Sequence, residues 1–369
     1  MFWYIVICIL MLYPLGMVIV GNRSGRKTQH LALLFSCIVL WIFMAMRSSS
    51  VGVDTENYEY VFKQLSEAPL HKIFTIETFA TNSRTWKLDF EYGYRLYNKF
   101  ISFFTHNPHA ITVCNSSVII ILFYNLVKKN SMNCLLSVWL YITLGIYQTE
   151  MNVTRNAIAI LIVYNAFCFL KQNRWLAYTI CCLIGASFHK AVLVFIPLYW
   201  IIKKVRWNKK RINRFSFFMI ILSIIFPLVT PILKTILPFG LARYLVSNNS
   251  KTEAVLVGIF HLVLVLFIYF FMNRQEREKF YTENSISLTM FILNLFCFCI
   301  SSGIGYGARM AALFGPYMIL YIPELLSMIE SKKKKRRLIW GIVILCGCQY
   351  FLRLSINNIG GTMPYTFWG

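Results

Sequence analysis

Apolar residues in this chain form long runs that are separated by short clusters of charged residues. A helix needs roughly 20 apolar residues to cross the hydrocarbon core of a bilayer, so runs of about that length predict membrane spans. The pattern predicts about twelve spans, near residues 2–20, 30–46, 109–127, 133–148, 155–170, 175–188, 190–202, 215–237, 254–272, 284–300, 309–327 and 338–354. The four spans between 133 and 202 are short, so fusion of neighbours or a re-entrant pair stays open there. The expected count is therefore about ten to fourteen.

Composition places those runs in lipid. Hydrophobic residues make up 58% of the chain and charged residues only 14%, and the mean hydropathy is +0.60. We expect an all-α integral membrane protein, a polytopic helical bundle that forms one domain over residues 1–369. The eleven cysteines all fall inside predicted spans, where small buried apolar residues are expected rather than disulfides or metal ligands.

The chain has a net charge of +23, and its basic residues are distributed unevenly among the predicted loops. If the N-terminus lies outside, six alternate loops carry 23 of the 37 basic residues, which the positive-inside rule assigns to the cytoplasm. Both termini are then predicted outside the cytoplasm. The run Lys332 to Arg337 lies between two apolar spans, which favours a topology anchor over a nuclear signal, and no nucleic-acid partner is expected.

The predicted outer segment 47–108 holds seven of the fourteen acidic residues. Its last part, near 90–104, repeats aromatic and aliphatic residues at spacings of three and four, and its polar residues fall on the opposite side. The apolar side consists of Phe90, Tyr94, Tyr97, Ile101 and Phe104, and the polar side of Glu91, Arg95, Asn98, Lys99 and Ser102. This pattern predicts an amphipathic helix in the membrane interface with its aromatic side chains toward the lipid.

A polar island, Arg47 to Tyr58, opens this segment and contains Asp54, one of only two Asp residues in the chain. Four further polar groups stand at outer span ends, namely Asn152-Val-Thr-Arg155-Asn156, Ser187-Phe-His189-Lys190, Leu241-Ala-Arg243-Tyr244 and Gly305-Tyr-Gly-Ala-Arg309. Asn152, Arg155 and Asn156 are expected to share one helical face. Each arginine alone could extend to lipid headgroups, but several at one membrane depth favour a shared anionic ligand, for which diphosphate is the natural candidate.

Motifs for other chemistries are missing from the sequence. There is no Asp-x-Asp, P-loop, His-Glu-x-x-His or dinucleotide fingerprint. We therefore expect chemistry that uses no metal and no cofactor.

The polar motifs together resemble the EpsG family of exopolysaccharide polymerases, which is similar to the Wzy-type polymerases of O-antigen and capsule. The resemblance rests on Arg47 with Val51-Gly-Val-Asp-Thr-x-x-Tyr58, on Asn152-x-x-Arg155-x-x-Ile-Ala159, on Ser187-Phe-His-Lys-Ala191, and on Arg309 after a glycine- and serine-rich turn. The order of these motifs agrees over nearly the whole chain. Lys190 departs from the Ser or Thr that often follows the histidine in the family.

The resemblance implies a glycosyltransferase-C-like membrane enzyme in the bacterial cytoplasmic membrane. It would transfer an undecaprenyl-diphosphate-linked oligosaccharide onto another lipid-linked repeat unit at the outer face. A chain-length regulator and a flippase are the implied partners. Asp54 is the first candidate for general base and His189 the second. Arg47, Arg155, Arg243 and Arg309 would bind the diphosphate, and Asn152, Thr55 and Tyr58 would contribute to substrate binding.

Two other functions remain open from the sequence. A lipid-linked oligosaccharide flippase would carry ionisable groups near mid-span, whereas the notable charges here gather at outer span ends. A membrane O-acyltransferase would need a histidine within a span, for which His261 is the only candidate.

Overall fold

The computed structural model describes residues 25–81, 84–236, 251–282, 285–301 and 307–369. The predicted span 2–20, Arg243 and most of the glycine-rich turn before Arg309 lie outside the described residues. The chain divides into two compact units, the first comprising Met1–Tyr199 with Val343–Gly369 and the second Trp200–Ile342.

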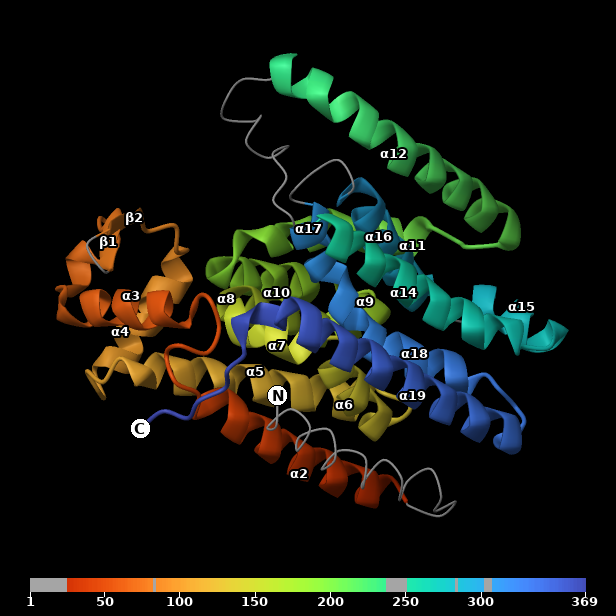
Figure 1. Ribbon diagram of the computed structural model, residues 1–369, viewed down its shortest axis with the longest axis horizontal. Helices are drawn as coiled ribbons and strands as arrows, with labels where there is room; N and C mark the ends of the chain where they lie inside the picture. Colours follow the sequence, from red (N-terminus) through yellow and green to blue (C-terminus); the bar gives the residue numbers. More distant parts are fainter. Residues whose placement is uncertain (1–24, 82–83, 237–250, 283–284, 302–306) are drawn as a thin grey trace. The chain divides into compact units, whose positions relative to one another are not determined.

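The first unit is a helical bundle with one short antiparallel hairpin (Figure 1). Helix α5 packs against α2 and α8, and α10 packs against α8. Its elements are α2 (Arg26–Ala45), α3 (Thr55–Glu67), η1 (Leu70–Lys72), β1 (Thr78–Thr81), β2 (Arg84–Lys87), α4 (Tyr92–Ser102), α5 (His109–Asn130), α6 (Cys134–Thr143), α7 (Ile146–Asn152), α8 (Thr154–Asn165), α9 (Phe167–Lys171), α10 (Trp175–Phe188), η2 (Lys190–Val194), the first half of α11 (Phe195–Lys204), the second half of α19 (Lys332–Asn357) and η5 (Ile359–Gly361).

The elements described in the second unit are all helices, and α16 packs against α12, α14 and α17. A buried histidine ties two of these helices together. His261 of α14 is 4% exposed, and its Nδ1 lies 2.8 Å from Nδ2 of Asn294 in α16. The elements are α12 (Lys209–Ile236), α14 (Lys251–Phe270), α15 (Arg274–Thr282), α16 (Ser285–Ser301), α17 (Gly307–Phe314), η4 (Gly315–Tyr317) and α18 (Met318–Ser327), together with the remaining parts of α11 and α19.

Five helices among the described residues are long and apolar enough to cross a membrane, or six if one bent helix pair counts as a single span. The five lie at Arg26–Ala45, His109–Asn130, Lys209–Ile232, Arg309–Ser327 and Lys332–Asn357. Cys134–Thr143, Trp175–Phe188 and Val255–Phe270 are shorter apolar helices. The protein is thus a helical integral membrane protein, and the full count of twelve spans stays a prediction.

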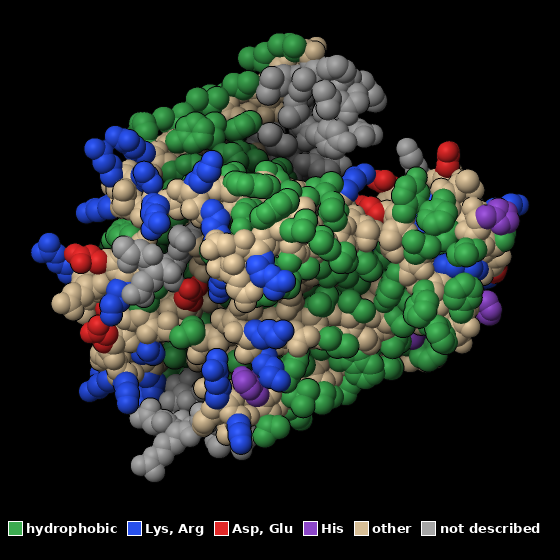
Figure 2. Space-filling view, turned by 180° about the vertical axis from the view of Figure 1, so that it is seen from behind, with side chains coloured by type: hydrophobic (Ala, Val, Ile, Leu, Met, Phe, Trp, Pro, Cys, Tyr) green, Lys and Arg blue, Asp and Glu red, His purple; other side chains and the backbone are tan. Residues whose placement is uncertain are grey.

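Helix α2 shows how such a segment divides its surface between protein and lipid. Its large exposed residues recur on one side, at Leu31, Leu34, Phe35, Ile38 and Ile42. The opposite side is buried. An apolar face without protein contacts is stable when lipid covers it, because lipid makes no demand for polar groups. Figure 2 shows hydrophobic side chains at the surface over large areas of one face of the molecule.

Two of the predicted spans are broken into shorter helices. Within 133–148, α6 ends at Thr143 and α7 begins at Ile146, because Gly145 between them adopts a positive φ of 76°, a conformation that favours glycine. The predicted span 155–170 is divided at Ala166 between α8 and α9. The first break places the end of α7 beside the segment that follows α2.

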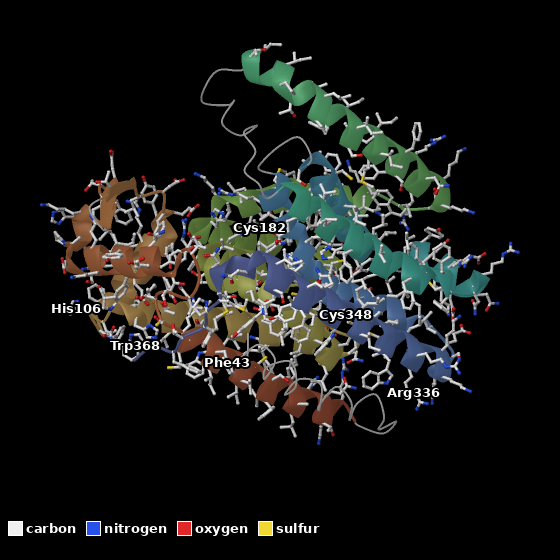
Figure 3. All side chains as sticks on the ribbon, viewed as in Figure 1. Phe43, His106, Cys182, Arg336, Cys348 and Trp368 are labelled. Atoms are coloured by element: carbon white, nitrogen blue, oxygen red, sulfur yellow. The ribbon has the colours of Figure 1, made fainter. Side chains whose placement is uncertain are left out.

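The C-terminal tail covers the segment that follows α2. Ser48 N donates to Thr366 O over 2.9 Å, and Trp368 N donates to Met46 O over 2.8 Å. The ring of Phe367 packs on Phe43 at 5.8 Å between centroids. Phe43 and Trp368 accordingly lie near one another in Figure 3. The tail therefore fixes the backbone that leads from α2 into the polar island.

Candidate functional site

The polar island forms a closed loop between α2 and α3, and Arg47 holds it to the bundle. The Arg47 side chain is 1% exposed. Its Nη2 donates to Met151 O over 2.9 Å, its Nη1 donates to Met44 O, and its Nε lies 3.4 Å from Oγ1 of Thr55. A buried guanidinium is stable when backbone oxygens accept its protons. Arg47 therefore joins the ends of α2 and α7.

Gly52 and Asn152 shape the turn that presents Asp54. Gly52 has a φ of 91°, and a Cβ there would lie 2.9 Å from Oγ1 of Thr55. Two residues on, Asp54 N donates to Oδ1 of Asn152 over 2.8 Å. Asp54 is half-buried and is the N-cap residue of α3, where a carboxylate also meets the positive end of the helix dipole. The loop thus brings Asp54 to the end of α7.

One correction concerns the helical face expected for Asn152, Arg155 and Asn156. Asn152 ends α7, whereas Arg155 belongs to α8. Val153 interrupts the helix with φ −100° and ψ 58°. The i, i+3 relation therefore fails. The sequence carries no proline or glycine that would mark this break.

Arg155 lies against an acidic and aromatic surface supplied by the outer segment. Its Nη1 is 2.6 Å from Oε2 of Glu91 and 3.1 Å from the Asp89 carbonyl oxygen. The guanidinium carbon lies 4.0 Å from the ring centroid of Phe90 and 5.8 Å from that of Tyr94. A guanidinium over an aromatic face gains a cation–π attraction. The Arg155 side chain keeps 16% of its surface exposed.

Tyr58 of α3 is buried beside Arg155. Burial raises the pKa of its hydroxyl, and the positive charge of Arg155 opposes that rise. Its ring packs on Phe90 and Tyr94 at centroid distances of 5.6 and 6.0 Å. Tyr58 therefore belongs to the same cluster as Arg155.

His189 joins the cluster from the end of α10. It is the C-cap residue of that helix, with an extended backbone that turns the chain into η2. Its Nδ1 lies 3.1 Å from Oε1 of Glu91, and 30% of its side chain is exposed. The next residue, Lys190, donates its backbone N–H to the same oxygen over 3.0 Å, and its Nζ lies 3.5 Å from Asp89.

Glu91 is the residue that sequence reasoning missed. The sequence pattern predicts Glu91 on the polar side of an interfacial helix, whereas in the structure its carboxylate contacts both Arg155 and His189. Burial would raise its pKa, but the hydrogen bond from His189, the charge of Arg155 and the Lys190 N–H outweigh burial and hold the pKa below its usual value. The available signal was its position directly ahead of a helix, between two aromatic residues in the acidic outer segment.

A second correction concerns the faces of α4. Tyr94 and Ile101, which were expected to face lipid, are buried inside the protein. The polar residues Arg95, Asn98 and Lys99 are buried as well, at 6%, 0% and 9% exposed. The surface strip is apolar instead, and consists of Leu96, Phe100, Phe103 and Phe104.

The physical reason lies in the two buried cations of α4. Arg95 donates to the carbonyl oxygens of five residues, Ile73, Phe74, Ile76, Leu88 and Phe90. Lys99 Nζ donates to Ser66 O and Ala68 O over 2.9 and 2.8 Å, which satisfies carbonyls at the end of α3. Backbone oxygens thus replace the water that periodicity assigned to this face.

Of the remaining predicted residues, Thr55 belongs to the first unit but lies outside this cluster. Thr55 is buried in the loop, where its Oγ1 donates to Val51 O over 2.7 Å. Arg309 belongs to the second unit, where it is exposed near the start of α17. Arg243 falls among residues that are not described. No group of three His, Cys, Asp or Glu side chains that could hold a metal occurs in the described part of the chain.

These features define a polytopic helical membrane protein whose first unit contains a cluster of Arg155, Glu91 and His189. A family model matches residues 30–367, and the chain belongs to the EpsG family. EpsG is a family of Wzy-type exopolysaccharide polymerases. No curated protein matches the chain. No solved structure matches it.

Proposed function

We propose that this protein polymerises a surface polysaccharide by transferring an undecaprenyl-diphosphate-linked oligosaccharide to the non-reducing end of another lipid-linked repeat unit. Membership of the EpsG family supports polysaccharide polymerase activity at a coarse level. The observation that carries the finer proposal is the cluster of Arg155, Glu91 and His189, which places a cation for a phosphate leaving group beside a group that can accept a proton.

Arg155 is the diphosphate-binding residue with the best support. Its guanidinium carries five N–H donors in a fixed plane, which suits two-point contact with phosphate oxygens. Negative charge develops on the diphosphate as the glycosidic bond breaks, and a cation fixed in a poorly hydrated site stabilises that charge. Arg309 and Arg243 are proposed as diphosphate-binding residues from the sequence motifs alone. Arg47, with 1% exposure, is proposed to act by holding the Asp54 loop to α7.

Two groups compete for the proton of the acceptor hydroxyl. Asp54 occupies the N-cap position of α3, and its negative charge contributes to the raised pKa of Tyr58 in the cluster. His189 is held at Nδ1 by an ionised carboxylate, which leaves its second nitrogen for proton transfer. This arrangement favours His189 as the base. Asp54, with Asn152, is then proposed to bind or orient sugars, and the buried Thr55 and Tyr58 are proposed to hold the Asp54 loop and the cluster in place.

Undecaprenyl substrates reach such a site from the lipid phase, so we place it at the outer face of a bacterial cytoplasmic membrane in a glycosyltransferase-C-like bundle. The exposed apolar strip of α4 suits contact with the interface. Reporters fused after Lys129, Arg174, Lys210 and Arg337 should then be cytoplasmic, and a tag within residues 60–85 should be outside. A tag that can be labelled only from the cytoplasm would reverse this orientation.

The function is tested by the surface glycan of a deletion strain. Loss of a polymerase leaves single repeat units on the lipid carrier and at the surface. Loss of a flippase would leave none, and loss of an O-acyltransferase would leave full-length chains without acyl groups. Restoration of the ladder by the wild-type chain is the matched control. Full-length polymer in the deletion strain would rule out the proposed activity, as would a surface without any repeats.

A further inference from the structure

The Glu91 carboxylate connects two elements that are distant in sequence and that both carry candidate site residues. Oε1 accepts from His189 Nδ1 over 3.1 Å and from Lys190 N over 3.0 Å, and Oε2 lies 2.6 Å from Nη1 of Arg155. Only 14% of the Glu91 side chain is exposed. Both oxygens are thus occupied by groups from α8 and from the junction of α10 with η2.

The ionisation state of Glu91 decides how the imidazole is oriented. Its pKa is held below the usual value because three donors outweigh burial. An ionised carboxylate only accepts hydrogen bonds, so Nδ1 of His189 must carry the hydrogen of this contact. In the neutral ring the lone pair then lies on Nε2. The contact therefore selects one tautomer of His189.

A close contact between α4 and α10 fixes the distance between Glu91 and His189. Gly93 lies two residues after Glu91, and Ser187 lies two residues before His189. A Cβ on Gly93 would stand 2.3 Å from Oγ and 2.8 Å from the backbone oxygen of Ser187. Only glycine permits this approach of α4 to α10. The geometry that joins Glu91 to His189 thus depends on a residue with no side chain.

We propose that Glu91 is a positioning residue that holds His189 with Nε2 ready to accept the proton of the acceptor hydroxyl. This inference rests on the proposed function. In the step, the acceptor O–H bond breaks and its proton passes to His189 Nε2. The acceptor oxygen forms a bond to the anomeric carbon of the donor, and the electron pair of the broken C–O bond leaves on the undecaprenyl diphosphate.

The test uses the purified full-length protein and a lipid-linked repeat unit as both donor and acceptor. Glu91→Gln keeps the size of the side chain and removes its charge. We expect kcat to fall about 100-fold, within the range of general acid–base effects. The KM for the lipid-linked repeat unit should stay within about two-fold of wild type, because Glu91 is proposed to orient the base and not to bind the substrate. Asp89→Asn is the matched control, since Asp89 is 78% exposed and pairs only loosely with Lys190, and its rate should stay within about two-fold of wild type.

A double-mutant comparison separates positioning from general stability. Glu91→Gln combined with His189→Ala should be no slower than His189→Ala alone, because Glu91 acts through the histidine. If the Gln variant does not accumulate, Glu91→Asp keeps the charge on a shorter side chain and should retain more activity than Glu91→Ala. Multiplicative losses in the double variant would overturn the inference, as would a Glu91→Gln variant with an unchanged kcat and a raised KM. A wild-type protein that forms no polymer would instead remove the proposed function.

Discussion

Arg47 and Arg155 show how differently one residue type can be used within a single unit. Both stand in motifs for which the sequence predicts contact with a diphosphate. Arg47 is 1% exposed, and backbone oxygens of Met44 and Met151 accept its protons. Arg155 keeps 16% exposure and lies between a carboxylate and the rings of Phe90 and Tyr94. An arginine whose donors are all used by buried backbone carbonyls has a structural role. An arginine in an ion pair at a partly exposed surface can instead exchange its carboxylate partner for an anionic ligand.

Among substitutions of Arg155, Asp54 and Arg47, the largest effect on turnover should come from Arg155→Lys. A lysine keeps the charge but loses the planar set of donors and the stacking on Phe90. We expect polymerisation to fall about 100-fold, as for the loss of one stabilising donor, with normal protein abundance. Turnover with the purified enzyme and membrane levels of the variant provide the measurement. If the Arg155→Lys variant makes polysaccharide of wild-type length, Arg155 has a structural role like that of Arg47.

Asp54→Asn should have a smaller effect on turnover. The amide keeps the shape of the side chain, while the negative charge is lost. We expect about a ten-fold rise in the KM for the acceptor with kcat less affected, because Asp54 is proposed to bind sugars. Steady-state kinetics with varied acceptor distinguish the two constants. If kcat collapses while the KM for the acceptor stays constant, Asp54 rather than His189 is the base.

Arg47→Lys should leave chemistry least affected and should act on stability. A lysine cannot reach the carbonyls of Met44 and Met151 together, so at least one buried acceptor loses its partner, at a cost of about 1–3 kcal/mol. The expected result is a lower thermal midpoint in detergent and turnover per folded molecule within a few-fold of wild type. Ser50, exposed in the same loop, offers a control in Ser50→Ala, which should change neither. If the Arg47→Lys protein is fully stable but has lost turnover, Arg47 acts in the reaction as Arg155 is proposed to do, and the contrast between the two arginines is wrong.

Several residues of the candidate site can be predicted from the sequence, because polar and charged residues at the ends of apolar spans are easily recognised. Asp54, Tyr58, Arg155 and His189 were singled out, and the structure brings Tyr58, Arg155 and His189 into one cluster in the first unit, with Asp54 in the adjoining loop. The helix near 90–104 was also predicted, and α4 occupies 92–102. Hydrophobic periodicity and charge placement were sufficient for these features.

The errors have a common physical origin in the backbone. Carbonyl oxygens do not appear in a pattern of side chains, yet they are what allows Arg95 and Lys99 to be buried. The break at Val153 has no marker residue, so Asn152 was placed on the wrong face. The Glu91 contacts depend on the close approach of Gly93 to Ser187, which only the folded structure reveals.

The central claim is that glycosyl transfer takes place at the Arg155, Glu91 and His189 cluster. The most direct measurement compares purified wild-type protein with His189→Ala on the same lipid-linked repeat unit and resolves the products by length. The account predicts a ladder from wild type and a rate reduced about 100-fold or more in the variant, with binding of the lipid-linked donor retained. A ladder of equal length and rate from His189→Ala would contradict it.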